Sequence, residues 1–173
     1  MYKNIILDRD GIINEVVFRD GIVSSPWGIN EFKFLDESQN FLSELSKSGK
    51  KLFVASNQPD IKRKNLPLQE LEKMNELIKL RYKIIEIFIC PHDDNDNCTC
   101  RKPLPGMLNS ILKKYNLKHT QTCMIGDSKK DVEAAYNAKI DSFFYDTSYN
   151  KLNVDKHANA SIFKSFNELQ CLL

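Results

Sequence analysis

Near its start the chain reads Lys3-Asn4-Ile5-Ile6-Leu7-Asp8-Arg9-Asp10-Gly11-Ile12-Ile13-Asn14, an apolar run that ends in two aspartates. A continuous apolar run of this kind is typical of a buried strand in a parallel sheet. The carboxyl ends of such strands open onto the crevice where α/β sheets bind ligands. Two carboxylates placed there repel each other unless a cation lies between them, and carboxylate oxygens suit Mg²⁺. The same residues also fit a plain turn. The residues downstream have to decide between a turn and a metal-binding site.

Apolar runs and helical patterns alternate along the rest of the chain. Further strands are expected over residues 51–55, 84–89, 122–126 and 140–145. Helices are expected over residues 36–48, where Asp36 would act as the N-terminal cap, and near 68–78, 107–115, 132–136 and 166–169. Breakers at Gly21, Pro26 and Gly28 predict a long irregular loop over residues 15–34. This alternation favours an α/β fold, a Rossmann-like parallel sheet with helices on both faces, in a single domain spanning residues 1–173.

Bulk properties narrow the range of partners. The chain has 173 residues and a net charge of +2, too small to favour nucleic acid or an anionic membrane as a partner. No apolar run approaches membrane-spanning length, and the first strand leaves no room for a signal peptide. We therefore expect a cytoplasmic protein, a monomer or small homo-oligomer, that acts on a small molecule.

Four predicted strand ends bring chemically active side chains to one crevice. If these side chains form a catalytic site, Asp8 would attack phosphorus and form an aspartyl-phosphate. Asp10 would protonate the leaving alkoxide and later accept a proton from the hydrolytic water. Mg²⁺ would be held by the Asp8 carboxylate, the Asp10 main-chain carbonyl and Asp127. The pattern thus predicts a phosphoryl-transfer site.

Three polar residues complete the predicted site. The Ser56 hydroxyl and the Lys102 ammonium would hold the transferring phosphoryl oxygens. Arg101 offers a planar fork for further substrate oxygens. Taken singly, Ser56 also fits a turn, Asp127 a helix cap, and Arg101-Lys102 a solvated pair. Their arrival in this order, each near the carboxyl end of an apolar strand, favours the catalytic interpretation.

The five cysteines form an odd set, which argues against a disulfide framework. Cys90, His92, Cys98 and Cys100 offer three thiolates and one imidazole, a closed tetrahedral set suited to structural zinc. Residues 90–102 have almost no apolar content, so zinc would order this loop. A reduced, metal-free cluster and a Cys98–Cys100 disulfide are the alternatives. The other cysteines and histidines are expected to be packing or surface residues: Cys123, Cys171, His119 and His157.

Four motifs resemble those of the haloacid dehalogenase superfamily of phosphatases: Asp8-Arg9-Asp10-Gly11, Ser56-Asn57-Gln58, Lys102 and Gly126-Asp127-Ser128-x-x-Asp131. The run Cys-Pro-His…Cys-Thr-Cys-Arg-Lys-Pro is similar to the branch that holds heptose bisphosphate phosphatases and histidinol phosphatases. The resemblance implies the roles given above and adds Arg9 and Asn57 to the substrate- or phosphate-binding residues. The interval between Asp10 and Ser56 is too short for an inserted cap domain, so loops would roof the site.

The substrate is less sharply indicated than the reaction. The leading expectation from the resemblance is a Mg²⁺-dependent phosphomonoesterase that cleaves heptose 1,7-bisphosphate at the 7-position in surface-polysaccharide metabolism. Histidinol phosphate is the alternative within the same chemistry, and a non-catalytic signalling module phosphorylated on Asp8 is the alternative of another class. The chain departs from the family pattern at Pro59-Asp60 and Ser128. Arg101 and residues 62–64 favour a second anionic group on the substrate, whereas the acidic residues of 93–96 favour an ammonium.

Overall fold

The sheet confirms the predicted architecture. In the computed structural model, which describes residues 1–150 and 160–173, six parallel strands lie in the order β5-β4-β1-β6-β7-β8. β1 (Asn4–Leu7) lies between β4 (Lys51–Asn57) and β6 (Thr122–Gly126). The outer strands are β5 (Glu86–Cys90), β7 (Asp141–Tyr145) and β8 (Ala160–Phe163). The strand that ends in the two aspartates is therefore central.

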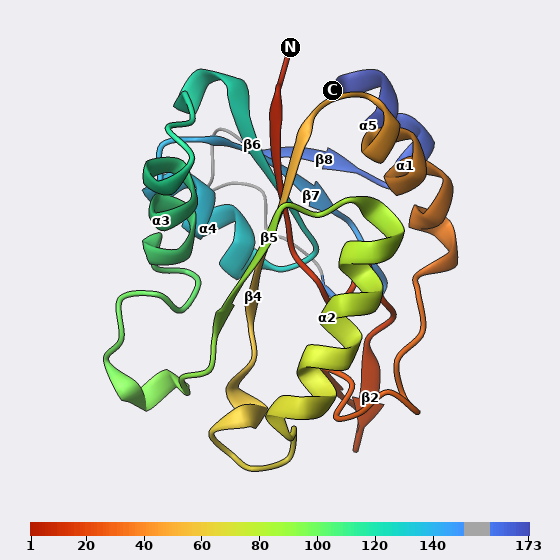
Figure 1. The fold of residues 1–173 in the computed structure, drawn as a ribbon, viewed down its shortest axis with the longest axis vertical. Helices are drawn as coiled ribbons and strands as arrows, with labels where there is room; N and C mark the ends of the chain where they lie inside the picture. Colours follow the sequence, from red (N-terminus) through yellow and green to blue (C-terminus); the bar gives the residue numbers. More distant parts are fainter. Residues whose placement is uncertain (151–159) are drawn as a thin grey trace.

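Helices cover both faces of the sheet, as Figure 1 shows. On one face lie α1 (Asp36–Lys47), α2 (Leu68–Tyr82) and α5 (Phe166–Leu172). On the other lie α3 (Gly106–Lys114) and α4 (Lys129–Asn137). Alternate residues of β1 point to opposite faces, so Ile5 and Leu7 join one apolar cluster and Ile6 the other. Short 3₁₀ turns occur at η1 (Pro59–Ile61), η2 (Asp94–Asp96) and η3 (His119–Gln121).

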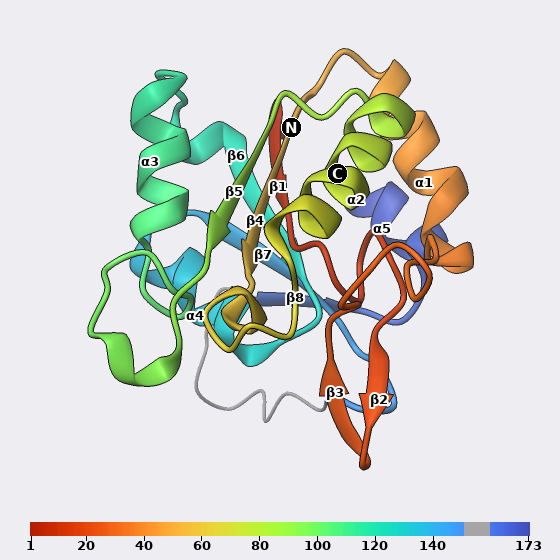
Figure 2. The same cartoon turned by 60° about the horizontal axis from the view of Figure 1, so that its bottom comes forward.

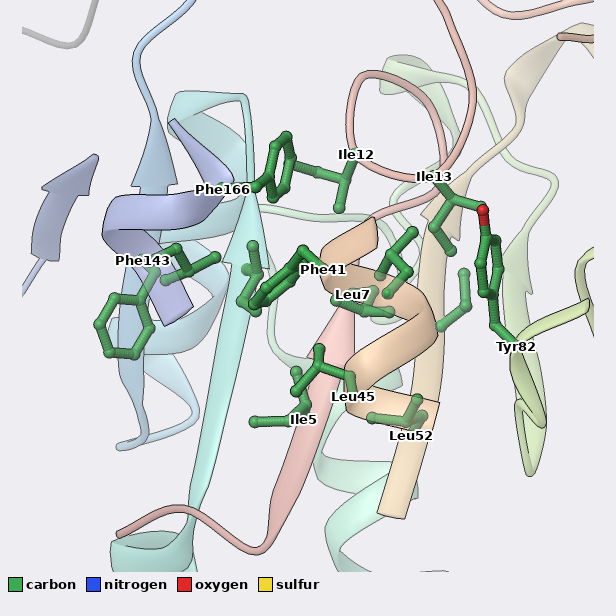
Figure 3. Close-up of a cluster of buried hydrophobic side chains, with 14 of the residues drawn as sticks. Ile5, Leu7, Ile12, Ile13, Phe41, Leu45, Leu52, Tyr82, Phe143 and Phe166 are labelled. Atoms are coloured by element: carbon green, nitrogen blue, oxygen red, sulfur yellow. The ribbon is translucent and has the colours of Figure 1, made fainter. Parts of the chain in front are cut away.

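The core also fixes the loop that follows β1. Ile12 and Ile13 are fully buried beside the α1 side of the sheet, together with Ile5 and Leu7. Figure 3 shows these side chains in the same apolar cluster as Phe41 of α1. Burying an isoleucine side chain contributes about 1.5–3 kcal/mol. Two such residues therefore hold the Asp8–Asp10 loop against the core rather than leaving it to solvent.

The expectation of an irregular loop over residues 15–34 is wrong in part. The segment contains an antiparallel hairpin of β2 (Val17–Arg19) and β3 (Ile22–Ser24), which lies at the carboxyl end of the main sheet (Figure 2). Asp20 and Gly21 connect the strands with φ of 50° and 77°, the conformation of a type I′ hairpin turn. The Asp-Gly pair was the available signal, but three-residue strands are too short for alternation to reveal them.

The expected cap of the first helix is also wrong. α1 begins at Asp36, its N-cap residue is Leu35, and no side chain caps it. The Asp36 carboxylate instead accepts a hydrogen bond from Gln39 Nε2 at 2.6 Å. Asp36 still places a negative charge in the first turn, where the helix dipole favours it.

The remaining local expectations concern isolated residues. Cys123 is buried within β6, and Cys171 and His119 are exposed, as expected. His157 lies outside the described residues. Among the helices that the structure describes, none combines the length and apolar content needed to cross a bilayer.

Candidate active site

The strand ends open onto a cavity of about 380 Å³ at the carboxyl edge of the sheet. The hairpin, the η1 turn and the loop after β5 all lie at this end of the molecule (Figure 2). The cavity lining includes seven of the residues predicted from the sequence: Asp8, Asp10, Ser56, Asn57, Arg101, Lys102 and Asp127. Side chains from β1, β4, β6 and the residue 90–102 loop therefore meet as the parallel topology requires.

Lys102 lies buried between two carboxylates. Its Nζ is 2.9 Å from Asp8 Oδ1 and donates to Asp131 Oδ1 at 2.5 Å. Burial alone would lower the pKa of Lys102, but the charges of Asp131 and Asp8 outweigh it and raise the pKa. The lysine is therefore a fixed cation beside Asp8.

Asp131 belongs to the motif Gly126-Asp127-Ser128-x-x-Asp131, but no role for it was predicted from the sequence. Its Oδ2 accepts hydrogen bonds from the main-chain N–H and the hydroxyl of Ser128, at 3.0 and 2.6 Å. Ser128 and Asp131 thus form the capping box that starts α4. Since Lys102 occupies its other oxygen, Asp131 supports the lysine. Its place four residues after Asp127, on the first turn of the helix, was the signal that could have revealed it.

Three carboxylates crowd the same corner of the cavity. Oxygens of Asp8, Asp127 and Asp131 lie within 4.8 Å of one another. Burial, followed by repulsion from Asp131, raises the pKa of Asp8 well above its ordinary range. The same two causes raise the pKa of Asp127 to about 7. Because both oxygens of Asp131 are occupied, Asp8 and Asp127 are the carboxylates that fit a hard divalent cation.

The position of Asp127 depends on its close neighbours. Its Oδ2 accepts hydrogen bonds from the Tyr149 hydroxyl at 2.9 Å and from Asn150 Nδ2 at 3.3 Å. Gly11 lies so near that a Cβ there would fall 2.1 Å from the same oxygen. Gly11 also has a φ of +84°, a conformation that residues with a Cβ rarely adopt. The short distance to Asp127 and the positive φ both explain why a glycine follows Asp8-Arg9-Asp10.

Asp10 is held by donors on both of its oxygens. Oδ1 accepts from Arg9 Nε and Nη2, at 3.2 and 3.0 Å, and from Asn14 Nδ2 at 2.8 Å. Oδ2 accepts from Gln58 Nε2 at 2.6 Å. The Arg9 side chain is 0% exposed and pairs with Asp10. In this arrangement Arg9 orients Asp10, and its contact with the substrate stays a prediction.

Asn57 joins two of the predicted motifs. Its Nδ2 donates to the main-chain oxygen of Lys102 at 2.9 Å, and its Oδ1 accepts from the Lys102 N–H at 3.0 Å. The end of β4 is therefore tied directly to the segment that carries the lysine. Asn57 therefore holds the Lys102 segment in place while lining the cavity, and its contact with the substrate stays a prediction.

The cysteine loop gathers its four candidate ligands. The three Sγ atoms and His92 Nδ1 lie within 4.8 Å of one another. Zn–S bonds of about 2.3 Å at tetrahedral angles place sulfur atoms roughly 3.8 Å apart. Cys90 Sγ lies 3.7 Å from Cys98 Sγ and 3.1 Å from Cys100 Sγ. All the cysteines are free thiols, so the alternative Cys98–Cys100 disulfide is not formed. The set fits zinc in its chemistry, and the Cys90–Cys98 separation matches the tetrahedral spacing, whereas Cys100 lies closer to Cys90 than a bound zinc would allow.

The same loop orients Arg101. Its Nε donates to Asp94 Oδ1 at 2.7 Å, and its Nη1 donates to the main-chain oxygen of His92 at 3.0 Å. Arg101 is thereby fixed to the residues around His92, a candidate zinc ligand. Only 8% of the residue is exposed, at the cavity wall. A planar guanidinium held in this way retains donors for a substrate oxygen.

The two oppositely charged sets on the rim pair with each other. Arg63 donates to both oxygens of Asp93, at 2.5 and 2.6 Å, and Lys62 pairs with Asp96. The Arg63 guanidinium lowers the pKa of Asp93 to about 2. Neither set therefore presents unpaired charge through these four residues. They connect the η1 turn to the cysteine loop instead.

The family model of the haloacid dehalogenase-like hydrolases matches residues 3–139. The chain belongs to this family. As a member of a hydrolase family, it is an enzyme rather than the non-catalytic signalling module considered from the sequence. Asp8, which follows β1, and Asp127, which follows β6, both fall within the matched range.

Curated relatives and solved structures agree with the family. A Neisseria meningitidis protein named D-glycero-beta-D-manno-heptose-1,7-bisphosphate 7-phosphatase is 39% identical over 76% of this chain and 71% of its own length. A Helicobacter pylori protein of the same name is 32% identical over 80% of each chain. The crystal structure of D,D-heptose 1,7-bisphosphate phosphatase from B. bronchiseptica, complexed with magnesium and phosphate, has a TM-score of 0.84 and 25% identity over 99% of both chains. These similarities support phosphatase activity.

Proposed function

We propose that this chain is a Mg²⁺-dependent phosphomonoesterase that removes the 7-phosphate of D-glycero-β-D-manno-heptose 1,7-bisphosphate. The observation that carries the proposal is the placement of Asp8 beside Lys102 and Asp127 at the base of a polar cavity. A carboxylate next to a fixed cation and a metal-binding carboxylate suits attack on a phosphate ester. The names of the relatives indicate the substrate.

Asp8 is the nucleophile in this mechanism. Its Oδ1 is held by the Arg9 main-chain N–H at 2.7 Å and by Lys102, so we assign the attack to Oδ2. The new bond joins Oδ2 to phosphorus, while the bond between phosphorus and the sugar oxygen breaks. Asp10 gives its proton to the departing oxygen, which leaves as the alcohol.

Hydrolysis of the aspartyl-phosphate reverses these roles. Asp10, now a carboxylate, takes a proton from water as the water oxygen bonds to phosphorus. The bond between Asp8 and phosphorus breaks, which frees inorganic phosphate and restores both side chains. Ser56 and Lys102 hold the phosphoryl oxygens in both steps, and Arg101 contacts substrate oxygens beyond them.

Each metal has its own proposed ligands. Mg²⁺ held by Asp8, Asp127 and the Asp10 main-chain carbonyl would supply positive charge against the phosphoryl group. A structural zinc held by Cys90, His92, Cys98 and Cys100 would order the loop that positions Arg101 and Lys102.

Arg101 at the cavity wall supports a bisphosphate over a phosphate that bears an ammonium. Asp93 and Asp96 would have to bind an ammonium, but Arg63 and Lys62 already pair with them. Asp94 is engaged by Arg101. The same ion pairs also engage Arg63 and Lys62, so neither the acidic nor the basic residues of the rim decide between the two substrates.

A kinetic panel with millimolar Mg²⁺ tests the proposal. We expect kcat/KM for heptose 1,7-bisphosphate to exceed that for histidinol phosphate by at least about tenfold, roughly 1.4 kcal/mol in transition-state binding. The sugar product should retain its 1-phosphate, which phosphorus NMR identifies. Arg101→Lys keeps the charge but removes the fork, so it should reduce this preference. A preference for histidinol phosphate, or release of the 1-phosphate first, would contradict the assignment.

A further inference from the structure

Gln58 is a buried polar residue to which the proposed mechanism assigns no role. It follows the last residue of β4 and is 0% exposed. Its main-chain N–H donates to the Cys90 oxygen at 2.8 Å, which fixes the backbone to the end of β5. Its side-chain Nε2 donates to Asp10 Oδ2 at 2.6 Å and to Ser56 Oγ at 2.8 Å. A single amide nitrogen thus contacts two proposed site residues.

We propose that Gln58 is a positioning residue that aligns Asp10, which handles the proton, with Ser56, which holds the phosphoryl group. The inference rests on the proposed phosphatase function. A primary amide carries two N–H protons, and both are used here. The Oε1 atom of Gln58 is buried without a hydrogen-bond partner among the described residues. The site therefore uses the donor end of the side chain, and a flipped amide would set an oxygen against the Asp10 carboxylate.

The first consequence concerns which oxygen of Asp10 moves the proton. Oδ1 already accepts from Arg9 and Asn14, whereas Oδ2 accepts only from Gln58 among the described residues. Oδ2 therefore keeps a lone pair for the proton that passes to and from the substrate. The Gln58 bond also fixes the rotation of the carboxylate, so this lone pair has a defined direction.

The second consequence concerns the hydroxyl of Ser56. A hydroxyl has one proton to donate and two lone pairs that accept. Because Gln58 donates to the Ser56 oxygen, that contact occupies a lone pair and not the proton. The proton is left to donate to a phosphoryl oxygen. Gln58 thereby presents Ser56 as a donor, which is the form that a transferring phosphate requires.

The test compares two esters that differ in their need for a proton. Gln58→Met has a similar length but no donors. We expect kcat for heptose 1,7-bisphosphate to fall by about 100-fold, as for a misplaced catalytic group, while KM changes much less. Hydrolysis of p-nitrophenyl phosphate should fall by less than about tenfold, because its phenolate leaves with little help from an acid. Gln58→Glu, which keeps the shape but lacks the amide protons, should repeat the pattern if the methionine variant fails to fold.

A double-mutant cycle identifies the route of the effect. If Gln58 acts through Asp10, then Gln58→Met should add little to the loss already caused by Asp10→Asn in sugar phosphate hydrolysis. Equal losses on both esters, or an undiminished effect in the Asp10→Asn background, would overturn the positioning role. If the wild-type protein hydrolyses neither ester, the proposed function itself is wrong. The two failures are therefore distinguishable.

Discussion

The crowded carboxylates predict that the protein without Mg²⁺ loses stability as the pH rises. Burial, reinforced by repulsion from Asp131, raises the pKa of Asp127 from 3.8 to about 7. A carboxyl group with a raised folded pKa binds more protons in the folded state than in the unfolded state. The free energy of unfolding therefore falls as the pH rises through the interval from the unfolded to the folded pKa.

The size of the effect follows from this shift. Above the folded pKa the full shift applies and costs the folded protein about 4 kcal/mol. Between about pH 6 and about pH 8.5 the decrease due to Asp127 alone is on the order of 1 kcal/mol. Asp8, whose pKa is also raised by burial and by Asp131, acts in the same direction. The measured decrease in the free energy of unfolding over this pH interval should therefore be at least this large.

Urea unfolding followed by circular dichroism measures this decrease in protein dialysed against buffer that contains neither Mg²⁺ nor a chelator. Asp127→Asn is the matched control, because its amide does not titrate and the slope should decrease. Adding Mg²⁺ to about 100 times its dissociation constant should raise the free energy of unfolding at high pH by about 2.7 kcal/mol. A stability that stays level or rises with pH, or an unchanged slope in Asp127→Asn, would refute the reasoning.

Three further predictions concern single residues. Asp8→Asn should abolish phosphate release without lowering the melting temperature, since an amide cannot attack phosphorus, and retention of more than roughly a few per cent of activity would contradict the covalent route. Elemental analysis should find one zinc per chain, and Cys100→Ser should reduce both zinc content and phosphate affinity; a zinc-free protein with all thiols titratable would exclude the metal. Gly11→Ala should cost at least about 1 kcal/mol in backbone strain and raise the Mg²⁺ needed for half-maximal activity, because its Cβ would displace Asp127. Gly49→Ala has a similar φ of +76° with nothing within 4 Å, so it should show the strain alone and leave the Mg²⁺ requirement unchanged.

The central part of the fold could be predicted because the sequences of buried parallel strands are continuous apolar runs. Ile5 to Leu7 and the run before Asp127 needed no alternation to be recognised, and the parallel topology then brought their polar ends together. The hairpin over residues 17–24 was missed because its strands are short and partly exposed, so neither length nor period marked them.

The sequence indicated which residues lie in the site, but it did not indicate how these residues contact one another. Arg9 carries a charge beside two aspartates, and only the fold reveals that its side chain is fully buried and pairs with Asp10. The pairing of Arg63 with Asp93 joins residues that are 30 positions apart, and no spacing rule connects them. Gln58 resembles any polar turn residue until its two hydrogen bonds are seen.

The ion pairs between the η1 turn and the cysteine loop have a consequence for chimeric enzymes. Each loop contributes one side of both pairs, Arg63 to Asp93 and Lys62 to Asp96. A cysteine loop grafted from a relative without these aspartates would leave Lys62 without its partner and Arg63 with only Asp60, 3.8 Å away. Residues 59–65 and 90–102 therefore form one exchangeable unit, and a transplant that alters substrate range has to carry both segments.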